Sequence, residues 1–128
     1  MIIAGVGCRK GASAAAVAAA IEAAFARAGL AQDLLDAIAT TADKGSEPGI
    51  TTAAITLGVP LVCVPPADLQ SASGRTISRS ERVVALTGLP SVAEAAALAA
   101  GGPAARLLSA RIAVGPVTCA LADTEPAP

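Results

Sequence analysis

Short apolar runs alternate with helical patterns along the first half of the chain. Residues 2–6 are apolar and are followed by glycines, which is typical of a buried strand that ends in a tight turn. Ser13 is suited to open a helix, because apolar residues then recur at helical spacing as far as Gly29. The pattern predicts strands at residues 2–6, 37–40 and 59–64, helices at residues 14–28 and 50–57, and a short helical turn at residues 31–35. Such alternation favours a largely parallel sheet.

The second half of the chain has less regular patterns. Residues 70–79 are rich in Ser, Gly and Arg, so we expect an irregular segment that could act as a mobile flap. Ser80 and Ser91 are each suited to start a helix. The apolar runs 105–114 and 117–121, separated by a Gly-Pro pair, predict a closing hairpin.

These elements predict a single α/β domain over residues 1–122, with a disordered tail at residues 123–128. We expect three layers, with a mainly parallel (mixed) β-sheet flanked by helices. The 128 residues are enough to bury a core, and a composition of 54% hydrophobic and 15% charged residues excludes a disordered chain. The only aromatic residue is Phe25, so the core should be aliphatic.

Composition also limits the partners. One aromatic residue cannot build a stacking surface for single-stranded nucleic acid, and a net charge of −1 gives no field that would attract DNA, RNA or an anionic membrane. We therefore expect neither a nucleic acid nor a membrane as partner. No window is apolar enough for a membrane helix and no secretory signal is readable, which predicts a cytoplasmic protein. A homodimer is an open option, since Ala-rich helices can pack between chains.

The cysteine and histidine content restricts the chemistry. The widely spaced Cys8, Cys63 and Cys119 fit reduced thiols, two of them in the core, better than a disulfide framework or a metal site. The chain has no histidine, which excludes a Ser-His-Asp or Cys-His mechanism within it and removes the commonest zinc ligand. We expect no metal and no cofactor.

The strongest local signal is the glycine-rich segment GVGCRKGAS at residues 5–13, which joins a strand to a helix N-terminus. Glycines let the backbone approach a ligand, free amides point outward at the helix start, and two cationic side chains are added, so the loop suits an anion. Its spacing matches neither the P-loop nor the dinucleotide motif, and a plain tight turn with surface cations is an equally open interpretation. The candidate binding residues in it are Gly7, Cys8, Arg9, Lys10, Gly11 and Ser13.

Further candidates lie outside this loop. Lys44 and Glu47 follow the second strand and should emerge at the same edge of a parallel sheet, where they could act as acid and base or form a surface ion pair. Ser80, and Ser91 with Glu94 three residues on, have the spacing of helix caps, although helix starts also bind carboxylates. Cys8 could be a reactive thiol beside the cations or a small turn residue.

Taken together, these segments resemble one family, formed by CobE and the C-terminal domain of CbiG, which are cobalamin-biosynthesis proteins. The matching features are the loop 5–11 with Ser13, the strand 38–40 followed by Lys44 and Glu47, the segment 80–84, Gly88, the helix start 91–98, and Val117-Thr118 with Ala120. They come in family order and cover nearly the whole chain.

The resemblance implies a role in building the corrin ring of vitamin B12, with a precorrin or corrin intermediate as ligand and other enzymes of the pathway as partners. For CbiG it implies the opening of a δ-lactone on a cobalt-precorrin with release of a two-carbon aldehyde. This sequence shows no preceding domain, and so resembles the stand-alone CobE form. Two hypotheses stay open: an accessory or carrier protein, which the missing histidine favours, or an enzyme, either a CbiG-like hydrolase or a precorrin-modifying subunit acting with a partner.

A precorrin carries several carboxylates, which suits a site with Arg9, Lys10 and Lys44 beside helix N-termini. Arg75 and Arg79, in the expected flap, could close over such a ligand as a lid or could simply be solvated.

Overall fold

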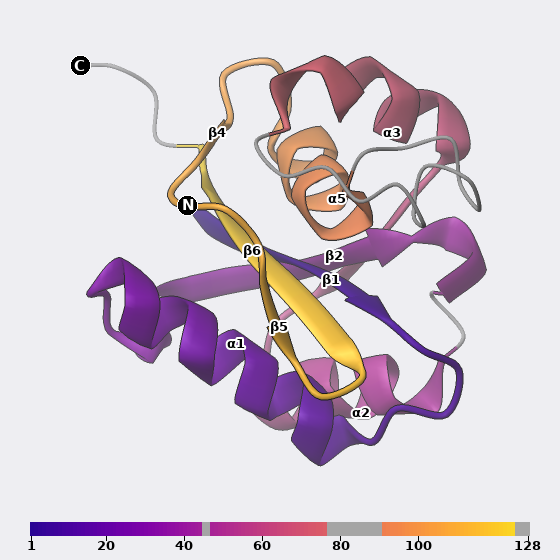
Figure 1. The fold of residues 1–128 in the computed structure, drawn as a ribbon, viewed down its shortest axis with the longest axis vertical. Coiled ribbons are helices and arrows are strands. Elements are labelled where there is room, and N and C mark those ends of the chain that lie inside the picture. The colour runs from indigo at the N-terminus through magenta and orange to yellow at the C-terminus, as the bar shows by residue number, and fades with distance from the viewer. Residues whose placement is uncertain (45–46, 77–90, 125–128) are drawn as a thin grey trace.

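The computed structural model describes residues 1–44, 47–76 and 91–124. In this part of the chain, an open mixed sheet of six strands is flanked by helices on both faces (Figure 1). The strands are β1 (Ile2–Cys8), β2 (Leu35–Thr41), β3 (Leu61–Val64), β4 (Arg106–Leu107), β5 (Ile112–Val114) and β6 (Val117–Asp123). The helices are α1 (Ala14–Ala28), α2 (Pro48–Leu57), α3 (Pro66–Ala72) and α5 (Val92–Gly101), with 3-10 turns at Gln32–Leu34, Ala42–Lys44 and Ser73–Arg75. The predicted α/β fold class is confirmed.

The sheet combines a parallel half with an antiparallel half. Its order is β3-β2-β1-β6-β4, and β5 also pairs with β6. β1, β2 and β3 run parallel, whereas β6 runs antiparallel to β1, with Gly5 opposite Ala39 on one side and Ala120 on the other. β1 is therefore a central strand, and the loop that follows it leaves at the carboxyl edge that it shares with β2 and β3.

The helices form two layers, with α1 and α2 on one face of the sheet and α3 and α5 on the other (Figure 1). Ile21 and Phe25 of α1 are buried in the first layer. In the second layer, the alanines of α5 let the helix approach β1 so closely that a Cβ at Gly5 would overlap the carbonyl oxygen of Ala93. The lack of a side chain at Gly5 therefore sets the distance between α5 and the sheet.

Several predicted boundaries are confirmed. α1 has the predicted bounds, the Ser13 hydroxyl accepts a hydrogen bond from the amide of Ala16 (3.1 Å), and Gly29 ends the helix in the left-handed conformation. The closing hairpin is confirmed as well, with β5 and β6 joined by a Gly-Pro turn. The predicted apolar run 105–114 is not one strand, because it contains β4 and β5, which pair with different parts of β6.

Residues 70–75 are helical, which corrects the prediction of an irregular segment there. They form the end of α3 and the 3-10 turn behind it. Leu69 and Ala72 are both buried at helical spacing, and this burial outweighs the Ser- and Gly-rich composition. The remainder of the expected flap and the helix expected from Ser80 lie outside the described residues.

The two ends of the described chain meet at the amino edge of the sheet. The amide of Thr124 donates to the carbonyl of Met1 (2.9 Å), so the sheet hydrogen bonding continues two residues past the expected domain end at residue 122. Residues 125–128 lie outside the described part. No helix in the described ranges is long and apolar enough to cross a membrane.

The three cysteines differ in burial. Cys119 on β6 is fully buried, Cys8 is partly buried and Cys63 is exposed. Of the two expected in the core, Cys119 lies in it and Cys8 packs against it from a partly buried position. Cys63 is exposed because β3 is an edge strand whose middle residues are not covered.

Candidate functional site

The glycine-rich segment forms a closed turn at the carboxyl end of β1. The amide of Arg9 donates to the carbonyl of Pro116 (3.0 Å), and the amide of Ala12 donates to the carbonyl of Arg9 (3.2 Å). Gly11 has a φ of 83°, which a residue with a side chain rarely adopts. The turn is thereby tied to the β5–β6 hairpin and fixed in shape.

Two cationic side chains extend from this turn. Arg9 and Lys10 are both exposed, and neither makes a side-chain hydrogen bond or ion pair with any residue in the described ranges. Their charges are therefore available to a ligand. Because Arg offers a planar set of donors and Lys a compact charge, the two together suit several carboxylate groups better than a single one.

Glu47 reaches the same turn from the next loop of the sheet. Its Oε1 accepts a hydrogen bond from the amide of Gly11 at 2.8 Å. The predicted meeting of Glu47 with the glycine-rich loop at the carboxyl edge is thus confirmed. Lys44 ends the 3-10 turn after β2, and its side chain lies outside what the structure describes.

Two helices begin side by side at this edge. A Cβ at Gly49, in the first turn of α2, would overlap the carbonyl oxygen of Ala12 just before α1. The first amides of each helix have no partner within the helix, and the helix dipoles add partial positive charge there. In α1 the Ser13 hydroxyl accepts from one of these amides, that of Ala16. Both helices therefore add to the positive potential around Arg9 and Lys10.

Two threonines that the sequence analysis did not single out as site residues hold the end of β1. The Thr40 hydroxyl donates to the carbonyl of Val6 (2.8 Å), one residue past the last paired position of β1 and β2. On the other side, the Thr118 hydroxyl donates to the carbonyl of Gly7 (3.2 Å). In the sequence, each is only a threonine in a predicted strand. Threonine is common in strands, so the pattern gives no sign of this role.

Ser91 and Glu94 begin α5 and are fully buried. The Ser91 hydroxyl accepts from the amide of Glu94 (3.4 Å), which confirms the predicted cap. The Glu94 carboxylate accepts from the amide of Arg111 (2.8 Å), before β5. The Glu94 side chain thereby ties the start of α5 to the segment before β5, while Ser91 caps the helix. Ser80 lies outside the described residues.

Arg75 does not lie at the candidate site, which corrects the expectation of a lid. Its guanidinium donates to the carbonyls of Ala105 (2.9 Å) and Gly102 (3.3 Å), behind the C-terminal end of α5. Carbonyls at a helix end lack helical partners, and a guanidinium can satisfy several of them at once. Arg79 lies outside the described residues.

Burial makes Cys119 chemically different from an ordinary thiol. Burial raises the pKa of the Cys119 thiol to about 12, so this thiol stays protonated and unreactive at neutral pH. Cys8 is the last residue of β1 and lies opposite Val117 of β6. The described residues contain no group of three His, Cys, Asp or Glu side chains that could hold a metal ion.

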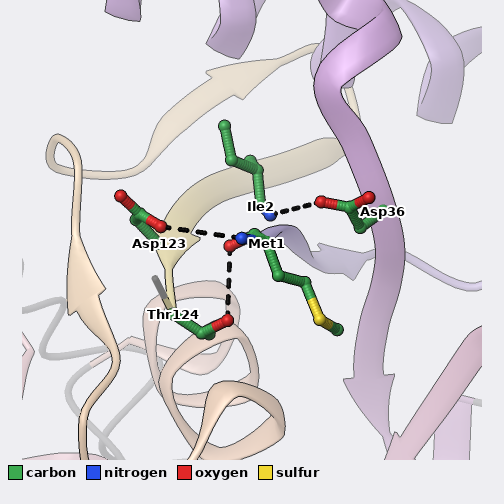
Figure 2. Close-up of polar contacts among 5 residues, drawn as sticks. All are labelled: Met1, Ile2, Asp36, Asp123 and Thr124. Atoms are coloured by element: carbon green, nitrogen blue, oxygen red, sulfur yellow. Dashed lines mark hydrogen bonds and ion pairs between the residues drawn. The ribbon is translucent and has the colours of Figure 1, made fainter. Parts of the chain in front are cut away.

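At the opposite edge of the sheet, acidic side chains pair with the N-terminal residues (Figure 2). The Asp36 carboxylate accepts from the amide of Ile2 (2.8 Å), and the Met1 ammonium lies 3.9 Å from the Asp123 carboxylate. Two carboxylates therefore hold the start of β1 by pairing with the chain's own groups, whereas Arg9 and Lys10, where β1 ends, have no partner among the described residues.

Comparison with known proteins places the chain in a family. The family model described as "Cobalamin synthesis G C-terminus" matches residues 2–122. Protein CobE from a Sinorhizobium species is 36% identical over 121 residues, which cover 94% of this chain and 79% of that protein.

Two solved structures are similar along nearly the whole chain. The crystal structure of CobE, described as a protein from the cobalamin (vitamin B12) biosynthetic pathway, has a TM-score of 0.88 at 38% identity, over 95% of this chain and 89% of that one. Cobalamin biosynthesis protein chiG from Agrobacterium tumefaciens has a TM-score of 0.79 at 40% identity, over 98% and 100% of the two chains. The chain therefore belongs to the cobalamin synthesis G C-terminal family, which includes CobE.

Proposed function

We propose that this protein binds a polycarboxylate precorrin or corrin intermediate of cobalamin biosynthesis and serves the pathway in the cytoplasm as an accessory or carrier protein. The observation that carries this proposal is the exposure of Arg9 and Lys10 on the glycine-rich loop beside two helix N-termini, with no side-chain partner for either among the described residues. The family membership supports the pathway, and the geometry supports the kind of ligand.

Corrin intermediates carry acetate and propionate groups around a large macrocycle. Charge-assisted hydrogen bonds from Arg9 and Lys10 would hold two of these carboxylates, and the starts of α1 and α2 would add favourable dipoles. The macrocycle itself would then lie outside the turn. This arrangement suits a protein that holds an intermediate and passes it on to another enzyme of the pathway.

The alternative is an enzyme, such as a CbiG-like hydrolase that opens a precorrin δ-lactone. The position of Glu47 favours it, because a carboxylate beside the two cations could remove a proton from an attacking water. Lys44 follows the same strand and could return a proton to the leaving oxygen. The absence of histidine from the chain leaves this chemistry to these two groups and gives preference to the binding role.

Titration with hydrogenobyrinic acid, followed by the visible spectrum of the macrocycle, tests the proposal. We expect saturable binding by the wild-type protein and at least about tenfold weaker binding by the double variant Arg9→Ala/Lys10→Ala, since two charge-assisted contacts are lost. Formation of an altered macrocycle during the titration would favour the hydrolase alternative.

A matched control removes two cations from the opposite edge. Arg27 is exposed in the last turn of α1, and Arg106 is exposed on β4 opposite Asp123. The variant Arg27→Ala/Arg106→Ala changes the net charge by the same amount and should bind like the wild type. Equal weakening in both double variants would show a general charge effect and contradict the proposed site, and a lack of binding by the wild type would contradict the binding function.

A further inference from the structure

One amide of the glycine-rich loop, that of Gly11, already donates to a carboxylate of the protein itself. Glu47 Oε1 accepts from the Gly11 amide at 2.8 Å, in an exposed contact between two loops. The space beside the Gly11 α-carbon is open, since a Cβ there would meet no atom within 4 Å. The contact shows that this amide can donate to a carboxylate and that it lies at an exposed position.

The Glu47 side chain is held by little else. Apart from the Gly11 amide, it makes no hydrogen bond or ion pair with a residue that the structure describes. Its backbone, in contrast, is fixed, because its carbonyl accepts from the amides of Ile50 and Thr51 at 3.1 Å each. The carboxylate can therefore rotate into solvent while the start of α2 stays in place.

We infer that Glu47 is an internal, displaceable carboxylate that a carboxylate of the ligand replaces on the Gly11 amide. The inference rests on the proposed function and deepens it, because it makes the site selective for carboxylates. In the free protein, Glu47 lowers the positive potential that Arg9 and Lys10 create. A polyanionic ligand is repelled by Glu47 and competes with it for the same donor, so ligand entry and release of Glu47 are coupled.

A different role for Glu47 would give the opposite result. If its contact with Gly11 served only to hold the loop in a binding shape, its removal would loosen the loop and weaken ligand binding. If the ligand displaces Glu47, neutralising this side chain removes its repulsion of the ligand and makes it a weaker competitor for the Gly11 amide. Ligand binding then becomes tighter. Glutamine keeps the oxygen that accepts from Gly11 and therefore preserves the fold of the loop.

The test compares the dissociation constants of hydrogenobyrinic acid for wild-type protein, Glu47→Gln and Asp36→Asn. Asp36 is a matched control, because it also accepts from a backbone amide at 2.8 Å but lies at the opposite edge of the sheet (Figure 2). We expect Glu47→Gln to bind about two- to fivefold more tightly, as for one partly screened charge, and Asp36→Asn to bind like the wild type. Glu47→Ala, which also removes the acceptor, should again bind more tightly than the wild type.

Two outcomes would overturn the inference in distinguishable ways. Binding by the wild type together with equal or weaker binding by Glu47→Gln and Glu47→Ala would overturn the displacement of Glu47 and leave the proposed function intact. Absence of binding by all four proteins would overturn the proposed function and this inference with it.

Discussion

Two threonine hydroxyl groups hold the end of β1 where the strand reaches the candidate site. Thr40 and Thr118 each donate to a carbonyl at the end of this strand, at 2.8 and 3.2 Å. These hydrogen bonds hold β1 beyond Gly5, the last of its residues that pairs with β2. The glycine-rich turn therefore starts from a rigid base, which lowers the entropy that a ligand would have to remove on binding.

The buried thiol of Cys119 predicts an alkaline loss of stability. Burial raises its pKa from 9.0 to about 12, so above pH 9 the unfolded chain releases this proton while the folded protein retains it. Stability should therefore fall as the pH rises from 9 towards 12, by at most about 4 kcal/mol over that range. Urea unfolding at a series of pH values would measure this loss, and the chain has no tyrosine to obscure it.

Two variants provide the controls for that measurement. Cys119→Ala should lose most of the alkaline slope, although its stability at neutral pH will be lower because a buried side chain becomes smaller. Cys63→Ala, which changes an exposed thiol, should keep the slope. An unchanged slope in Cys119→Ala would show that another group causes the alkaline loss.

At the residue scale, the sequence could predict contacts that follow from parallel strands but not those that depend on packing. The meeting of Glu47 with the glycine-rich loop follows from strand direction alone. Arg75 could not be placed in this way, because its carbonyl acceptors lie about 30 residues further along the chain. These carbonyls are available to Arg75 because they follow the end of α5. Nor could the sequence show that β3 is an edge strand, which is why Cys63 is exposed.

At the scale of elements, close backbone approach fixes how the helices lie on the sheet. α5 lies on β1 at Gly5, and α2 lies on the segment before α1 at Gly49. α1, with its clear caps and spacing, could be predicted to the residue. α3 could not, because its seven residues carry a short apolar pattern that only burial against the core makes helical.

The contact between α5 and β1 predicts a strong difference between two glycines. Gly5→Ala should destabilise the protein by about 3 kcal/mol, because the new methyl group would overlap the backbone of α5 and force the layers apart. Gly74→Ala, in the 3-10 turn after α3, meets open space and should change the unfolding free energy by less than about 1 kcal/mol. Urea denaturation of both variants would check this difference, and similar stabilities would show that α5 does not lie on β1 as closely as described.

At the scale of the whole molecule, the two edges of the sheet carry different groups. The amino edge joins the chain ends through Asp36 and Asp123, and the carboxyl edge carries Arg9 and Lys10 beside two helix starts. This difference could be predicted in outline from the strand–helix alternation, since the loops that follow parallel strands share one edge.

The most direct test of this account is a map of amide chemical shifts in isotope-labelled protein during titration with hydrogenobyrinic acid. We expect the largest changes on Arg9, Lys10 and Gly11 and on the first turns of α1 and α2, while Ile2 and Thr124 at the amino edge stay unchanged. Saturating shifts centred on any other surface, with the glycine-rich turn unaffected, would contradict it.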